Sequence, residues 1–302
     1  MNAPLPDSSD RAALVTLRDL VRYGVSRFNA AGLTFGHGSD NAYDEAVYLT
    51  LHALHLPPDT LEPFLDARLL PGERDRVLEL LERRVGERLP APYLTGEAWL
   101  RGHRFRVDPR VIVPRSPIAE LLEHGLAPWV DADSVGSVLD MCTGSGCLAI
   151  LAALAFPEAG VDAVDCSADA LEVAAANVAD YGLQPRVALH RSDLFDGLPA
   201  RAYDVIVCNP PYVNGASMHA LPREYRHEPE LALAGGADGM DLVRRILRDA
   251  PRFLQPEGVL VLEIGHERGH FEQAFPALEP VWLETDGTHD QILLLTRSQL
   301  AP

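Results

Sequence analysis

Val135-Gly-Ser-Val-Leu-Asp-Met-Cys-Thr-Gly-Ser-Gly146 consists of two halves that differ in composition. Its first half, 135–140, is apolar with β-branched residues, which predicts a buried strand. Its second half is a turn of small residues, and the apolar segment 147–156 after it predicts a helix. Small residues at 143–146 let the backbone approach a ligand closely. A strand, a glycine-containing turn and a helix in this order are typical of the first unit of a doubly wound α/β sheet.

Strands and helices alternate after this unit. Strands are expected at 160–165, 186–190, 204–208 and 258–264, and helices at 169–182, 239–253 and 267–275. Two further apolar runs, 279–284 and 291–295, predict an edge hairpin at the end of the chain. The alternation predicts an α/β fold with a doubly wound, mostly parallel, Rossmann-like sheet over residues 119–302.

The part before residue 119 has a different pattern. Apolar residues recur at helical steps in 10–33, 40–56 and 73–88, which predicts a small N-terminal helical domain over residues 1–88. Residues 93–107 then alternate as a β-hairpin does, with Gly102 in the turn. We therefore expect 89–118 to be a β-hairpin hinge between the helical domain and the sheet domain.

The composition limits the classes of partner. The net charge is −18, and residues 91–302 hold 30 of the 44 acidic residues. Such a chain repels DNA and attracts basic proteins, although the charge also serves solubility. The start of the chain shows no signal peptide, and no apolar run reaches the roughly 18 residues of a membrane span. Since no cysteine pair forms C-x-x-C, we expect reduced thiols, a cytoplasmic location and no membrane contact.

Asn209-Pro-Pro-Tyr212 follows directly on the expected strand 204–208. The two prolines end the strand and stiffen the tetrapeptide, because proline fixes φ and restricts the residue before it. In open α/β sheets, ligands bind at this end of the strands. An amide side chain, unpaired carbonyls and an aromatic ring at such a place favour a holder for a planar group that carries an NH₂.

Three acidic residues flank the small-residue turn and the next two strands. Asp140 directly precedes the turn, and Asp165 ends the strand at 160–165, where it is placed to accept two ribose hydroxyls. Asp193 follows the third strand and is placed to face an adenine amine. The turn is not G-x-G-x-x-G and the chain has no Walker lysine, so phosphate binding is poorly supported. An acid-lined pocket suits S-adenosylmethionine, whereas a NAD-type dehydrogenase leaves Asn-Pro-Pro-Tyr unexplained.

Together these motifs resemble the N(5)-glutamine methyltransferases. The matching motifs are V-L-D-M-C-T-G-S-G at 138–146, V-D at 164–165, S-D-L-F at 192–195 and N-P-P-Y-V at 209–213. The resemblance implies a class I methyltransferase fold that methylates a protein glutamine amide from S-adenosylmethionine. Residues 91–95, 113–120 and 224–231 are similar to the branch that acts on a large-subunit ribosomal protein. The release-factor branch has I-P-R-P-x-T-E where this chain has V-P-R-S-P-I-A-E.

The resemblance also implies roles for single residues. Residues assigned to the cofactor are Cys142, Thr143, Gly144, Ser145, Gly146, Asp165, Leu194 and Asn209, and those assigned to the substrate are Asn209, Pro210, Pro211 and Tyr212. Asp140 and Asp193 are added to the cofactor group from their positions alone. The family has glycine where Cys142 stands, so a positive φ at Cys142 would be strained.

A mechanism follows for the tetrapeptide. A carboxamide nitrogen is a poor nucleophile, so the substrate amide must be oriented toward the methyl group. We expect the Asn209 side-chain oxygen and the Pro210 carbonyl to accept the two amide hydrogens and to stabilise charge that develops on nitrogen. Tyr212 would stack on the amide plane, while Pro211 holds Tyr212 and Asn209 in a fixed relation.

Four alternatives remain open at this point. The first is the same chemistry on a peptide chain release factor. The second is DNA adenine methylation, which also uses Asn-Pro-Pro-Tyr but needs a basic groove. The third is a non-catalytic ribosome assembly factor with a vestigial cofactor site. The fourth is a zinc site at His266-Glu-Arg-Gly-His270, which matches H-E-x-x-H but lacks an evident third ligand. We expect no metal.

Overall fold

The computed structural model describes residues 7–198 and 201–301, which form two compact units. The helical unit consists of Met1–Ala98 together with Pro222–His227. The sheet unit consists of Trp99–Leu221 and Glu228–Pro302. The helical unit thus extends ten residues beyond the expected boundary at residue 88. It also takes in a short segment from the part of the chain that we expected to lie wholly in the sheet domain.

The helical unit is built on amphipathic helices. Its helices are α1 (Ser8–Ala13), α2 (Leu17–Ala31), α3 (Ala42–Ala53), α4 (Leu61–Phe64), α5 (Pro71–Glu87) and α6 (Ala91–Thr95). A capping box of Thr16 and Asp19 starts α2, and Gly32 ends it with a φ of 56°. Leu20, Phe28 and Leu81 are fully buried between α2, α3 and α5.

A buried ion-pair network lies within the helical unit. Arg84 of α5 is fully buried, and its Nε donates to Glu45 Oε1 at 2.7 Å. Glu224, also fully buried, accepts from the backbone N–H of Thr34 at 3.1 Å and pairs with Arg88 at 3.0 Å. Because a buried carboxylate needs such partners, these contacts fix the segment Pro222–His227 to the helices.

The sheet unit contains one large sheet and a small hairpin. The hairpin strands are β1 (Glu97–Leu100) and β2 (His103–Arg106), and β1 begins in the helical unit. Arg101 and Gly102 both have positive φ at the turn, as expected for Gly102. The large sheet has the order β5-β4-β3-β6-β7-β9-β8. Its strands are β3 (Ser137–Met141), β4 (Gly160–Asp165), β5 (Val187–Arg191), β6 (Tyr203–Cys208), β7 (Leu254–Glu263), β8 (Val281–Thr285) and β9 (Thr288–Thr296).

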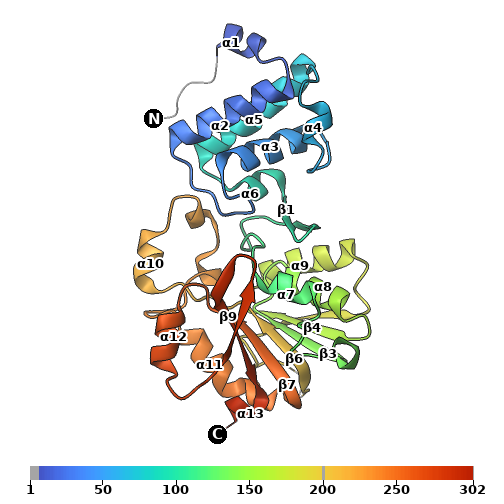
Figure 1. Ribbon diagram of the computed structural model, residues 1–302, viewed down its shortest axis with the longest axis vertical. Helices are drawn as coiled ribbons and strands as arrows, with labels where there is room; N and C mark the ends of the chain where they lie inside the picture. The colour runs from blue at the N-terminus through green and yellow to red at the C-terminus, as the bar shows by residue number, and fades with distance from the viewer. Residues whose placement is uncertain (1–6, 199–200, 302) are drawn as a thin grey trace. The chain divides into compact units, whose positions relative to one another are not determined.

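Helices cover both faces of this sheet (Figure 1). The helices of the sheet unit are α7 (Ile118–Glu123), α8 (Cys147–Ala155), α9 (Ala168–Asp180), α10 (Gly215–Ala220), α11 (Asp241–Asp249), α12 (Arg268–Ala274) and α13 (Arg297–Leu300). Side chains of neighbouring strand residues point to opposite faces, so Val138 packs with α8 in one apolar core and Leu139 packs with α11 in the other. The two cores explain why the strands are apolar at nearly every position.

The expected doubly wound fold is confirmed. β3 pairs in parallel with β4 on one side and with β6 on the other, so the strand order reverses between β3 and β6. The antiparallel β8 and β9 form the expected edge hairpin. A crevice opens beyond the carboxyl ends of the strands at such a reversal point, and this is where ligands bind in open α/β sheets. Within the ranges described, no helix combines the length and apolar character needed to cross a membrane.

Candidate active site

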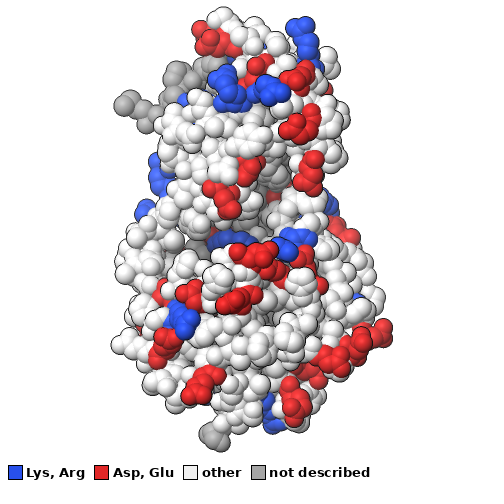
Figure 2. Space-filling view, in the orientation of Figure 1, with Lys and Arg blue, Asp and Glu red and all other residues white. Residues whose placement is uncertain are grey.

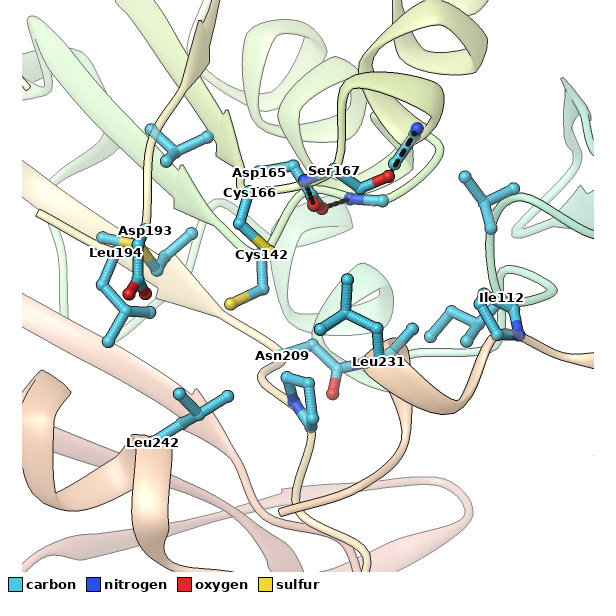
Figure 3. A pocket seen from close by; sticks show the side chains of 18 of the residues that line it. Ile112, Cys142, Asp165, Cys166, Ser167, Asp193, Leu194, Asn209, Leu231 and Leu242 are labelled. Carbon is cyan, nitrogen blue, oxygen red and sulfur yellow. Dashed lines mark hydrogen bonds between the residues drawn. The ribbon is translucent and has the colours of Figure 1, made fainter. Parts of the chain in front are cut away.

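A cavity of about 380 Å³ lies beyond the carboxyl ends of β3, β4, β5 and β6, within the sheet unit (Figure 3). This volume is within the range of small-ligand pockets, roughly 300–1,000 Å³. The predicted site residues that line it are Cys142, Gly144, Asp165, Asp193, Leu194, Asn209 and Pro211. Those that do not line it are Asp140, Thr143, Ser145, Gly146, Pro210 and Tyr212. The structure therefore brings together residues from four strand ends that are up to 69 positions apart.

The turn after β3 has a left-handed backbone at three positions. Cys142 has a φ of 63°, Gly144 of 54° and Gly146 of 80°. A Cβ on Gly146 would lie 3.1 Å from the Cβ of Ala174 in α9, so the turn also packs closely. The strain expected at Cys142 is present, since a left-handed conformation costs a non-glycine residue about 1–2 kcal/mol.

Asp165 reaches the cavity from the end of β4. Its Oδ2 accepts from the backbone N–H of Gly144, and its Oδ1 accepts from that of Ser167, both at 2.9 Å. A carboxylate oxygen has two lone-pair sites, so each oxygen can accept a further hydrogen bond. In Figure 3 the side chain lies at the edge of the open space. The geometry fits the acceptance of two ribose hydroxyls.

Asp140 lies behind the turn and is fully buried. Its Oδ2 accepts from the Thr143 hydroxyl at 2.5 Å and from the backbone N–H of Ala149 at 2.9 Å. Burial raises the pKa of Asp140 to about 7, despite the opposing effect of both hydrogen bonds. Because Asp140 does not line the cavity, its position allows it to hold the turn and the start of α8 but not to touch a ligand there.

Asp193 and Leu194 line the side of the cavity that follows β5. Asp193 is largely exposed and pairs with Arg245 of α11 at 3.0 Å, a partner that the sequence did not suggest. Leu194 is buried and has a φ of 51°. An apolar side chain beside an acid suits a purine ring with an exocyclic amine.

Asn-Pro-Pro-Tyr divides between the cavity and the protein interior. Asn209 and Pro211 line the cavity, whereas Pro210 is buried behind it. The Tyr212 hydroxyl donates to Glu263 Oε1 at 3.0 Å. A Cβ on Gly265 would lie 2.5 Å from the Tyr212 ring, so this ring packs directly on a glycine backbone. The tetrapeptide is held firmly from behind.

Glu263 is a site residue that the sequence reasoning missed. It ends β7, and the β6–β7 register pairs Cys208 with Leu262, which places Asn209 next to Glu263. Burial raises the pKa of Glu263 to about 6, and its hydrogen-bond donors oppose that rise. The sequence could have predicted Glu263 as a site residue, because it follows the apolar run Val259–Leu262 in the same way as Asn209 follows its own apolar strand.

Other residues of the cavity wall were not predicted to line the site. Ile112 comes from the segment after the hairpin, and Pro229, Leu231 and Ala232 come from the segment that follows the excursion into the helical unit. Leu231 is 62% exposed although it is apolar. Only the folded chain brings these residues to the strand ends.

The H-E-x-x-H match has a different use in the structure. Glu267 accepts from the Asn214 side chain at 2.7 Å and also contacts His270 Nδ1 at 2.5 Å. His266 contacts Gln291 instead. Among the described residues, no group of three or more His, Cys, Asp and Glu side chains is arranged to hold a metal ion.

Residues 123–223 match the family model described as "Methyltransferase small domain". The chain is 75% identical over 294 residues to the ribosomal protein uL3 glutamine methyltransferase of Bordetella pertussis, covering 97% of this chain and 99% of that protein. It is 64% identical to the protein of that name from Burkholderia pseudomallei, covering 94% of this chain and 95% of that protein.

The fold and the site define a methyltransferase that uses S-adenosylmethionine as its methyl donor. More narrowly, the chain belongs to the family of ribosomal protein uL3 glutamine methyltransferases. The predicted family, and within it the ribosomal-protein branch, is confirmed. The cavity fits S-adenosylmethionine, because Asp165 can accept further hydrogen bonds and Gly144 leaves room for close approach. The chain contains no lysine that could bind a phosphate, a group that this cofactor lacks.

Proposed function

We propose that this chain transfers a methyl group from S-adenosylmethionine to the side-chain amide nitrogen of a glutamine in a large-subunit ribosomal protein of the uL3 type. The observation that carries this proposal is 75% identity over almost the whole chain to a protein named for that substrate. The aligned region includes residues 91–120, where the two branches differ.

The cofactor side of the site is formed by the ends of β3, β4 and β5. We assign the ribose hydroxyls to Asp165, because both of its oxygens are anchored by backbone N–H groups and remain able to accept. The backbone of 142–146 approaches the ligand, and Leu194 and Asp193 flank the adenine. Asp140 acts indirectly by keeping Thr143 and the first turn of α8 in place.

Substrate orientation is assigned to Asn209 and Pro210. When bound, S-adenosylmethionine supplies a methyl on a sulfonium, whose C–S bond breaks as the new N–C bond forms. The Asn209 side-chain oxygen and the Pro210 carbonyl accept the two amide hydrogens, which turns the nitrogen lone pair toward the cofactor cavity. They also stabilise positive charge that develops on nitrogen, and one amide proton then leaves to solvent.

Tyr212 and Pro211 support this holder. The Tyr212 ring is fixed through its hydroxyl and by its packing on Gly265, which supports its proposed role of stacking on the substrate amide plane. Pro211 lines the cavity between Asn209 and Tyr212 and keeps the two side chains at a constant separation.

We assign substrate recognition to the helical domain and expect a basic protein partner. Acidic side chains are spread over the face shown in Figure 2, and the net charge is −18. Such a surface attracts a basic protein over distances near the Debye length, about 8–10 Å at moderate salt. It also disfavours direct DNA binding. We further propose a cytoplasmic location without membrane contact.

The test uses the purified full-length protein with labelled S-adenosylmethionine. Recombinant uL3 from the same organism, a release factor and unmethylated DNA are offered in parallel. We expect a 14-dalton increment on one glutamine of uL3, found by peptide mass spectrometry. Transfer to the release factor alone would overturn the substrate assignment. Transfer to DNA would overturn the reaction class.

A further inference from the structure

Glu263 lies outside the cofactor cavity but contacts the substrate holder from behind. Its Oε1 accepts from the Tyr212 hydroxyl at 3.0 Å, and its Oε2 accepts from the Ser116 hydroxyl at 2.5 Å. The Asn209 side-chain amide donates a further hydrogen bond to the same carboxyl. It lowers the pKa of Glu263 less than either hydroxyl does. Three neutral donors from two chain segments, the tetrapeptide Asn209–Tyr212 and Ser116, therefore converge on one buried carboxyl.

These contacts determine which end of the Asn209 amide faces the substrate. A side-chain amide has an accepting oxygen and a donating NH₂ of nearly the same size, so only its partners decide its orientation. An ionised carboxyl has acceptors alone. If the Asn209 NH₂ is turned toward Glu263, its oxygen is turned toward the cavity, where it can accept from the substrate.

We infer that Glu263 is a positioning residue for methyl transfer, which fixes the Asn209 oxygen toward the substrate amide and the Tyr212 ring beside it. Ser116 completes the arrangement from the segment before α7, since its hydroxyl occupies the second oxygen of the carboxyl. This inference rests on the proposed roles of Asn209 and Tyr212. It adds a residue that acts through them without touching the substrate.

The surroundings of Glu263 make its charge state sensitive to pH. The pKa of about 6 results first from burial, and the donors Ser116 and Tyr212 and the positive charge of Arg115 oppose that effect. Arg115 is itself paired with Glu228 at 2.5 Å. On the β6 side, burial raises the pKa of the Cys208 thiol, which stays neutral.

The remaining neighbours add no charge at neutral pH. Burial and the nearby Glu263 raise the pKa of Tyr212 well above its usual value, and the β9 partner of Glu263 is the apolar Ile292. Protonation of Glu263 below about pH 6 replaces one acceptor by a donor. Glu263 therefore no longer fixes the orientation of the Asn209 side-chain amide once the pH falls through 6.

The variant Glu263→Gln tests the inference, because a glutamine has the same shape but carries one NH₂. Its NH₂ attracts the Asn209 oxygen and turns the Asn209 NH₂ toward the substrate. We expect kcat to fall on the order of 10- to 100-fold, the usual cost of a misplaced catalytic group. The cofactor Kd from calorimetry and the KM for the protein substrate should change less than about threefold.

Glu257→Gln is the matched control, since Glu257 is an exposed glutamate on the same strand, β7. It should leave kcat, the Tm and the pH profile as in the wild type. The acid limb of kcat, with a midpoint near pH 6 in the wild type, should disappear in Glu263→Gln. Wild-type kcat in Glu263→Gln, with an intact fold, would overturn the inference.

A second measurement does not depend on the substrate. The Asn209 side-chain amide signal in NMR, assigned by its loss in Asn209→Ala, should shift with a midpoint near pH 6 in the wild type. In Glu263→Gln it should not shift over the same range. An Asn209 signal that is constant from pH 5 to 7.5 in the wild type would overturn the inference, whatever the enzyme methylates. Absence of methyl transfer by the wild type would instead overturn the proposed function.

Discussion

Asp140 and Glu263 are two buried acids at the ends of strands β3 and β7, and they differ in what they hold. Each accepts a hydrogen bond of 2.5 Å from a hydroxyl, Asp140 from Thr143 and Glu263 from Ser116. Burial raises the pKa of both acids. Asp140 also accepts from a backbone N–H, that of Ala149. The donors that reach Glu263 among the described residues are the side chains of Ser116, Tyr212 and Asn209.

The difference separates the two halves of the site. An acid that anchors backbone maintains a turn, and its effect on a bound ligand is a matter of shape. An acid that anchors side chains decides which atoms those side chains present, and its effect on the reaction depends on its protonation. We therefore expect changes around Asp140 to alter stability and cofactor affinity, and changes around Glu263 to alter kcat.

The largest effect on kcat is expected for Asn209→Ala, which tests the part of the site where Glu263 orients the Asn209 and Tyr212 side chains. Loss of the proposed acceptor for the substrate amide should lower kcat by about two orders of magnitude or more. The cofactor Kd should rise only modestly, since the turn and Asp165 are untouched. Steady-state kinetics and calorimetry on the same sample check both statements. A variant that keeps near wild-type turnover would refute the role given to Asn209.

Asp165→Ala tests the cofactor half. Removal of a charged acceptor of two ribose hydroxyls costs about 1.5–3 kcal/mol, which is a rise in the cofactor Kd of roughly 10- to 100-fold. The matched control is Asp169→Ala, because Asp169 is an exposed acid in the first turn of α9. Calorimetric titration of both variants decides the matter. Equal affinities in the two would remove the ribose role from Asp165.

Asp140→Asn tests the backbone-anchoring role through stability. Between about pH 4 and 7 the folded wild type holds the Asp140 proton while the unfolded chain has lost it, so stability falls as the pH rises through this window. The asparagine variant lacks this dependence. Its stability relative to the wild type should therefore rise between pH 5 and 7, by on the order of 2 kcal/mol.

Urea unfolding of Asp140→Asn and wild type at both pH values gives this difference. The cofactor Kd of the variant at pH 7 should stay within a few-fold of the wild type, because the amide oxygen can still accept from Ala149. A stability difference that does not change with pH would show that Asp140 is not protonated in the folded protein. A large loss of kcat alone would break the distinction from Glu263.

The smallest effect concerns the surface charge, which lies outside both halves. Raising the salt concentration from 0.1 to 1 M shortens the Debye length from about 10 to 3 Å and should raise the KM for a basic protein substrate severalfold. The cofactor Kd, set by buried hydrogen bonds, should change less. A KM that does not depend on salt would remove the electrostatic contribution to substrate capture.

The sequence predicts the strand ends well because local pattern determines them. The sequence shows a strand and its turn in Val138–Gly146, and the end of a strand in Asn209–Tyr212. The parallel sheet then brings the two segments together. Periodicity and glycine positions suffice for this. The alternation of strands and helices likewise predicts the fold class.

Contacts between distant segments are not readable in this way. The ion pair of Asp193 with Arg245 joins residues 52 positions apart, and the hydrogen bond of Ser116 to Glu263 spans 147. The sequence also predicts a cofactor contact for Asp140, whose position in β3 instead directs it into the core beside α8. Whether an acid at a strand end faces a ligand or the interior depends on packing that only the folded chain shows.

The excursion of Pro222–His227 into the helical unit limits how the family's parts can be exchanged. A chimera that takes residues 1–98 from one relative and the rest from another places the Glu224 segment of one protein against the Arg84 and Arg88 side chains and the Thr34 backbone of the other. The two stretches form one unit although 123 residues separate them. Retargeting this enzyme by swapping its N-terminal part therefore requires a double crossover that carries both pieces.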